Sequence, residues 1–377
     1  MLCNLYRWRH VFKRGVPSRL TMDTAWWRRP STLPLIILVM ALLIIVVGGS
    51  IRINDAGESC PDWPKCFGTY GFDVSTEEQE QYWDENPDEI DSRGENYRYT
   101  VFEIFLEWFH RLLVGIIAIP ILLNVYISSK TKQDYGESNF NASLFIAFML
   151  FIQAAAGAAT VFFDNVDWSV ALHLSLACIF SASIIWQYLL MRSKEGVKWD
   201  FLSTPSEFIL IHKKRFDAVA GSVFTLLILG AWVSSTAGGQ YNQSCSVGFP
   251  DGWPKCNGRF LPSLDGRTGV LIQMVHRIGA LVIGFIFISA ILKVRKDNLR
   301  FPESIIYSRV LYFALGFWCL NLMIGGSYLV LADSGDFPEW ISLLHLLGGV
   351  ICFLASIMCS LMIRLSISNN RTNLSEE

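Results

Sequence analysis

The chain has 377 residues, of which 52% are hydrophobic and 17% charged, and its formal net charge is only −2. Its apolar residues fall in long blocks rather than in periodic stripes, which excludes a fold built around one water-soluble core. A balance of 31 Lys and Arg against 33 Asp and Glu also gives no basic excess of the kind that nucleic acid attracts.

The clearest apolar block is residues 33–49, LPLIILVMALLIIVVGG, which contains no charge. A hydrocarbon core of about 30 Å is crossed by about 20 apolar residues, and a helix satisfies every backbone hydrogen bond within the segment. We therefore predict an all-α membrane protein with eight transmembrane helices. In chain order the predicted helices cover residues 33–50, 104–127, 141–162, 169–191, 217–237, 269–292, 309–331 and 341–364.

The segments between these blocks alternate in charge. Basic residues crowd the N-terminal tail and residues 130–132, 213–215 and 293–296, whereas acids crowd residues 77–91, 164–167 and 333–336. Because basic loops stay on the cytoplasmic side, we predict that both termini are cytoplasmic. The tail also resembles an organellar transit peptide, but it is poor in serine, and Met22 is an alternative start. We favour an ordinary tail followed by an uncleaved first helix.

The motif WPKC occurs twice, in CPDWPKC at 60–66 and in CSVGFPDGWPKC at 245–256. The next predicted helix carries EWFHR at 107–111 in one case and QMVHR at 273–277 in the other. We therefore predict two four-helix bundles repeated in parallel. The predicted divisions are a basic tail (1–32), a first bundle (33–191), a cytoplasmic linker (192–216), a second bundle (217–364) and a C-terminal tail (365–377).

The first repeat contains an additional acidic segment before its histidine. Cys66 and His110 are 44 positions apart, whereas Cys256 and His276 are only 20 apart. The inserted residues, around 74–100, are too polar to lie in lipid. They predict a cap on the outer face, and a solvated loop is the alternative.

Four of the six histidines lie one per even-numbered helix, all about 6–13 Å below the outer surface at a rise of 1.5 Å per residue. A lone intramembrane histidine often bonds a neighbouring helix, and zinc or copper would require further ligands. Two imidazoles per bundle instead suit the two axial positions of a heme iron. The predicted pairs are His110 with His173, and His276 with His345.

Other polar residues near these histidines differ in how well they fit that site. Glu107 stands three residues before His110, on the same helix face, so it could exchange a proton beside a heme, whereas the second repeat has Gln273 there. An interfacial glutamate facing headgroups is the alternative. Arg111 and Arg277 could pair with a propionate, although consecutive helical residues diverge by about 100°.

Two cysteine pairs lie in the predicted outer loops. Cys60 with Cys66 and Cys245 with Cys256 predict structural disulfides, because that compartment is oxidising, and redox-active pairs are the alternative. The cysteines within predicted helices are expected to be inert apolar residues. They are Cys178, Cys319, Cys352 and Cys359.

The combination of GGSIRINDAGESCPDWPKC, EWFHR, the second WPKC loop, QMVHR and the two later histidines resembles the heme A synthase family over nearly the whole chain. The resemblance implies that the C8 methyl group of heme O is oxidised to a formyl group, giving heme A. It implies that His110 and His173 face the substrate heme. It also implies that His276 and His345 ligate a resident heme b, and that Glu107 is the family's essential glutamate.

The family resemblance also bears on partners and location. Expected partners are heme O, the heme O synthase, membrane lipid, an unidentified electron acceptor and a second copy of the chain, with no nucleic acid. The bacterial cytoplasmic membrane is favoured over the mitochondrial inner membrane. Two other functions fit the residues: a diheme b-type protein that carries electrons from quinol, and a transporter with histidine proton relays.

Overall fold

A computed structural model describes residues 29–63, 65–90, 93–234, 244–264, 268–333 and 337–376 of the chain. Every regular element within these ranges is a helix, and the β-type pairs Cys66–Thr69 and Cys256–Arg259 are isolated bridges. Eight of the helices are long and apolar enough to cross a membrane. The prediction of an all-α chain with eight membrane-spanning helices is therefore confirmed.

The eight long helices extend beyond the apolar blocks because backbone hydrogen bonding continues past the end of the apolar stretch. They are α2 (Thr32–Ile53), α4 (Val101–Lys130), α6 (Glu137–Phe162), α7 (Asp167–Lys194), α8 (Ser206–Ser234), α9 (Thr268–Asn298), α10 (Ile305–Val330) and α11 (Glu339–Glu376). The shorter elements are α3 (Thr76–Glu85), α5 (Lys132–Tyr135) and the 3₁₀ turns η2 (Pro87–Glu89), η3 (Asp200–Ser203) and η5 (Pro302–Ser304).

Three helices extend into the segments predicted as linker and C-terminal tail. Much of the predicted linker, 192–216, is helical, because α7 ends at Lys194 and α8 already begins at Ser206. The predicted C-terminal tail continues α11 as far as Glu376. The predicted end of the fifth apolar block at residue 237, like the N-terminal tail before residue 29, lies outside the described residues.

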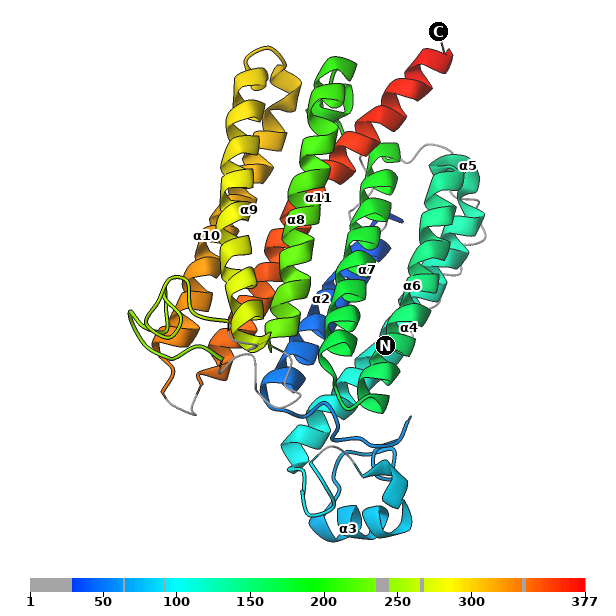
Figure 1. The fold of residues 1–377 in the computed structure, drawn as a ribbon. Helices are drawn as coiled ribbons and strands as arrows, with labels where there is room; N and C mark the ends of the chain where they lie inside the picture. The colour runs from blue at the N-terminus through cyan, green and yellow to red at the C-terminus, as the bar shows by residue number, and fades with distance from the viewer. Residues whose placement is uncertain are drawn as a thin grey trace.

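The long helices pack side by side with their axes nearly aligned (Figure 1). Helices α2, α4, α6 and α7 contact one another, as do α8, α9, α10 and α11. Contacts between these two sets run from α7 to α8 and from α11 to both α2 and α7. Gly49, near the end of α2, lies against Leu343 in the first turns of α11, so these two helix ends are held near each other.

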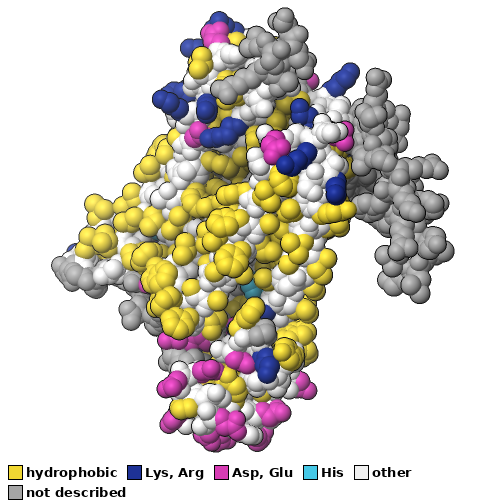
Figure 2. All heavy atoms as spheres, turned by 90° about the vertical axis from the view of Figure 1, so that its right-hand side faces the viewer, with side chains coloured by type: hydrophobic (Ala, Val, Ile, Leu, Met, Phe, Trp, Pro, Cys, Tyr) yellow, Lys and Arg dark blue, Asp and Glu magenta, His cyan; other side chains and the backbone are white. Residues whose placement is uncertain are grey.

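The surface of the bundle is apolar around its middle. Figure 2 shows a broad hydrophobic band, with acidic side chains gathered at the end that carries α3 and most basic side chains toward the other end. Phe151 is 70% exposed and Phe285 72% exposed, which in water would be costly for two such large apolar side chains. A band of this kind fits a lipid-facing surface.

Buried polar contacts tie the helices together at the basic end. The carboxylate of Glu195 accepts hydrogen bonds from the Ser31 hydroxyl at 2.7 Å and from Arg192 at 2.8 Å. His212, to which the sequence assigns no role, is fully buried, with Nε2 2.7 Å from Asp297 Oδ2. These contacts join α2 to α7 and α8 to α9.

The acidic insert of the first repeat forms a cap rather than a solvated loop. Phe67 makes edge-to-face contacts with Tyr82 and Trp83, whose ring centres lie 5.4 and 5.2 Å away. The Gln79 amide donates to the Tyr99 carbonyl at 2.9 Å, which ties α3 to the strand-like segment before α4. Burial and a hydrogen bond to a glutamate raise the pKa of Tyr82. The cap therefore has a small core of its own.

Replacing Trp83, which is 3% exposed, with Ala removes the centre of this core. We expect the cap to lose about 3–5 kcal/mol of stability, as for other buried aromatic truncations, while the membrane helices stay folded. Limited proteolysis of protein in vesicles should then cut the cap first. Exposed Gln81→Ala is the matched control, and a cap that resists protease equally in both variants would contradict the assignment.

Candidate functional site

The four predicted histidines lie on α4, α7, α9 and α11, and all are partly buried. The rings of His276 and His345 approach edge to face, with centres 6.3 Å apart and planes at 78°. His110 lies against Gly48 of α2, and His173 lies against Gly157 of α6. The structure thus brings the rings of His276 and His345 together.

Each histidine lies against a glycine of a neighbouring helix, which the sequence prediction missed. A Cβ placed on Gly325 would be 2.6 Å from the His345 ring, and one on Gly157 would be 3.0 Å from the His173 ring. The corresponding distances are 3.1 Å between Gly230 and His276 and 3.3 Å between Gly48 and His110. A glycine leaves the space that an imidazole needs between two helices. The sequence signal for these contacts is that each of the helices α2, α6, α8 and α10 has a glycine at the position facing a histidine.

The polar partners of the rings are also on the glycine-bearing helices. Nδ1 of His345 donates to the Asn321 carbonyl at 2.9 Å, which leaves its Nε2 free to bind a metal. The Gln153 amide donates to the His173 carbonyl at 3.0 Å and lies within 3.4 Å of both ring nitrogens. Asn321 and Gln153 each stand four residues before the glycine that faces the histidine.

The second pair fits a six-coordinate heme. Two imidazoles on opposite sides of one metal, each bonded at about 2 Å, have ring centres about 6 Å apart. The 6.3 Å between His276 and His345 matches that separation. His276 Nδ1 is buried and has no hydrogen-bond partner among the described residues. Within those residues no three His, Cys, Asp or Glu side chains gather around a point that could hold a bare metal ion.

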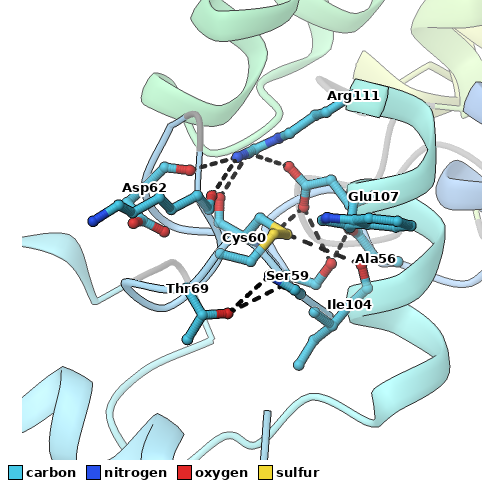
Figure 3. The surroundings of a disulfide bond; sticks show 12 residues. Ala56, Ser59, Cys60, Asp62, Thr69, Ile104, Glu107 and Arg111 are labelled. Atoms are coloured by element: carbon cyan, nitrogen blue, oxygen red, sulfur yellow. Dashed lines mark hydrogen bonds and ion pairs between the residues drawn. A yellow bond between two sulfur atoms is a disulfide. The ribbon is translucent and has the colours of Figure 1, made fainter. Parts of the chain in front are cut away.

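The carboxylate of Glu107 is directed at the first disulfide loop (Figure 3). It accepts hydrogen bonds from the Cys60 amide at 2.9 Å and the Ser59 hydroxyl at 3.1 Å. It also pairs with Arg111 Nη2 at 2.5 Å. Because Glu107 is only 5% exposed, it faces the protein and not the lipid headgroups.

Arg111 and Arg277 fasten the two WPKC loops to the histidine helices. Arg111 donates to the carbonyls of Cys60 at 2.7 Å, of Lys65 at 3.1 Å and of Asp62. We call the bonds of Arg111 and of Arg277 to the loop carbonyls the arginine clamps. Both arginines therefore bond loop carbonyls, which is a different arrangement from the predicted pairing with a heme propionate.

In the second repeat the clamp lacks the carboxylate. Arg277 donates to the carbonyls of Gly252 at 2.9 Å and Lys255 at 2.7 Å. One of its nitrogens, Nη2, is buried and has no hydrogen-bond partner in the described part of the chain. Gln273, 4% exposed, occupies the position equivalent to Glu107. The first site thus has an ion pair between a buried glutamate and a half-buried arginine, where the second has a half-buried arginine and a buried amide.

Both predicted disulfides are present in the structure. Cys60 is joined to Cys66, and Cys245 to Cys256, with Cα–Cα distances of 4.3 and 4.9 Å. All four cysteines are at most 3% exposed. Of the cysteines predicted to be inert, three are buried, whereas Cys319 is exposed on the apolar surface.

Comparisons with known proteins agree with this arrangement of residues. Residues 31–357 match the model of a family described as cytochrome oxidase assembly protein (COX15-CtaA). The chain is 23% identical to a heme A synthase of Halalkalibacterium halodurans over 86% of its own length and 93% of the relative's. It is 25% identical to a heme A synthase of Lysinibacillus sphaericus over 84% and 91% of the two lengths. A heme A synthase of Shouchella clausii is 24% identical over 66% and 70%.

Gly325→Ala tests the contact between glycine and histidine. The added methyl group would lie 2.6 Å from the His345 ring, so the imidazole must move away from its partner. We expect heme retention to fall on the order of tenfold, a change of about 1.4 kcal/mol. Gly316→Ala on the same helix is the control, because a Cβ there meets nothing within 4 Å. Equal heme content in the two purified variants would show that the contact is unimportant.

Proposed function

The chain belongs to the cytochrome oxidase assembly protein family COX15-CtaA, and on that premise we propose that it is a heme A synthase. It is a multi-pass membrane oxidoreductase, and it converts the C8 methyl group of heme O into the formyl group of heme A. Relatives named heme A synthase match most of the chain. The observation that carries the proposal is the pairing of histidines in both repeats, with a buried carboxylate beside only one pair.

The two histidine pairs have different roles in this proposal. His276 and His345 hold a resident heme b, which supplies one-electron transfer when bound. His110 and His173 orient the substrate, heme O, in the first bundle. The 6.3 Å between the rings of the second pair supports this assignment, because two histidines so close together would both be able to hold one heme iron.

Glu107 accepts protons in the first bundle. Oxidation of a methyl group by water, CH₃ + H₂O → CHO + 4 H⁺ + 4 e⁻, releases four protons and four electrons. The Glu107 carboxylate is buried, lies one turn of α4 from His110, and is held by Arg111 and the Cys60 amide. Its position is therefore fixed by groups that do not leave when the substrate does. Gln273 in the second bundle cannot take a proton.

The membrane arrangement is part of the same proposal. Residues 33–191 form a substrate bundle and residues 217–364 a cofactor bundle, repeated in parallel, and both termini are cytoplasmic. The alternation of basic and acidic segments supports this orientation. We place the protein in a bacterial cytoplasmic membrane, because relatives that match the chain are bacterial. The heme O synthase delivers the substrate, and an electron acceptor and a second copy of the chain complete the expected partners.

Pigment extraction tests the proposal against a diheme electron carrier and a transporter. Protein co-expressed with a supply of heme O should yield heme b together with heme O or heme A. His276→Ala and His345→Ala should lose heme b, whereas His110→Ala and His173→Ala should keep it and produce no heme A. If the wild type contains only heme b, bound in equal amounts by both bundles, the result would favour an electron carrier. A colourless protein would favour a transporter.

Glu107→Gln keeps the shape and one acceptor oxygen but removes the titratable group and the ion pair with Arg111. We expect the turnover of heme O to fall at least about 100-fold, the usual contribution of a general base, while the heme b spectrum stays unchanged. Glu80→Gln, on the exposed face of the cap, is the control. Full activity in Glu107→Gln would rule out its role as proton acceptor.

A further inference from the structure

The two WPKC loops place their tryptophans differently. Trp63 in the first loop is 74% exposed. Trp253 in the second loop is tucked against α10 beside Tyr328 and Phe337. A Cβ on Gly326 would lie only 2.8 Å from the Trp253 indole, so this glycine makes the room for it. At the equivalent position of α6, the residue after Gly157 is Ala158.

The lysines of the two loops also differ. The Lys65 ammonium lies over the ring of Tyr70, 5.4 Å from its centre, and Tyr70 is 73% exposed. Lys255 instead forms an ion pair with Asp251 at 3.7 Å. The first loop therefore presents an exposed indole, an exposed phenol ring and a cation. The second loop also exposes two aromatic rings, Phe249 at 69% and Phe260 at 65%, but its tryptophan is packed against α10 and its lysine is paired with Asp251.

The backbones of the two loops share two fastenings. Each is closed by a disulfide, and each is fastened by an arginine clamp through the carbonyl of the WPKC lysine. The loops differ in length, because the disulfide joins cysteines 6 positions apart in the first loop and 11 positions apart in the second. Through the Arg111 clamp, the exposed aromatic pair is attached directly to the helix that carries His110.

We propose that Trp63, Tyr70 and Lys65 form an entry site for heme O at the outer end of the first bundle. This inference rests on the function proposed above. A tetrapyrrole is a flat aromatic ring with two carboxylates, so its face stacks on the indole and phenol rings and a propionate pairs with the lysine. Trp253 closes the equivalent position of the second bundle, which holds its heme permanently.

The test uses the full-length protein with its resident heme b in phospholipid nanodiscs, supplied with heme O from detergent micelles. Trp63→Ala is expected to lower kcat/KM for heme O about tenfold, the effect of losing an aromatic stacking partner, with kcat at saturation unchanged. Trp63→Phe should restore most of the loss. Lys65→Gln should reduce kcat/KM and weaken its dependence on salt. Phe260→Ala is the matched control, because Phe260 is the equivalent of Tyr70 and is 65% exposed.

Three results would overturn the entry site. The first is a wild-type kcat/KM in Trp63→Ala, and the second is an equal loss in Phe260→Ala, which would indicate general anchoring of aromatic residues at the membrane interface. The third is a loss in kcat with KM unchanged. The resident heme b spectrum reports whether each variant is folded. A wild type that retains heme b but never converts heme O would refute the proposed function itself, which distinguishes that failure from failure of the entry site alone.

Discussion

The bonds from Arg111 of α4 and Arg277 of α9 to the carbonyls of the two WPKC loops hold both sites in place. A disulfide closes each loop but does not orient it relative to the bundle, and a loop lying over a membrane helix has carbonyls that need partners. The forked guanidinium serves several of them at once. Because Arg111 is the next residue after His110 on α4, its bonds to the loop also fix the position of the loop relative to the histidine. The partners of Glu107 then come from that loop, so its orientation depends on the same bonds.

The two bundles use this common framework with different interiors. In the first, the Asn124 amide donates to Gln187 at 2.7 Å, and Gln187 donates in turn to Asn139 at 3.2 Å, all nearly or fully buried. Counting from the paired histidines, the second bundle has Ala290 and Cys359 at the positions of Asn124 and Gln187, and both are buried and apolar. A satisfied polar network holds a helix geometry more specifically than apolar packing does. This difference accompanies the carboxylate that only the first bundle possesses.

The sequence predicts what depends on composition and repetition, and misses what depends on close packing. Eight apolar blocks predict the eight helices, and a repeated histidine predicts each pair, because both signals extend over many residues. The glycines that face the histidines carry no such signal, since small residues are common in membrane helices for many reasons. The divergence of about 100° between neighbouring helical residues correctly separates Arg111 from the face of His110, yet only the folded loop shows what the arginine bonds instead. The helix ends also extend past the apolar blocks, because hydrogen bonding and not hydropathy determines where a helix stops.

A bundle that exchanges its ligand and a bundle that retains it need different outer ends, even when their ligands have the same shape. Retention is favoured when side chains fill the space above the ligand, because each packed aromatic ring must be displaced before the ligand leaves. The room for such packing comes from Gly326 beneath Trp253. In the first bundle Trp63 remains on the surface, so nothing of that size must be displaced there. Under the proposed function, the placement of Trp63 and Trp253 is thus a difference that would separate a site for a substrate from a site for a cofactor.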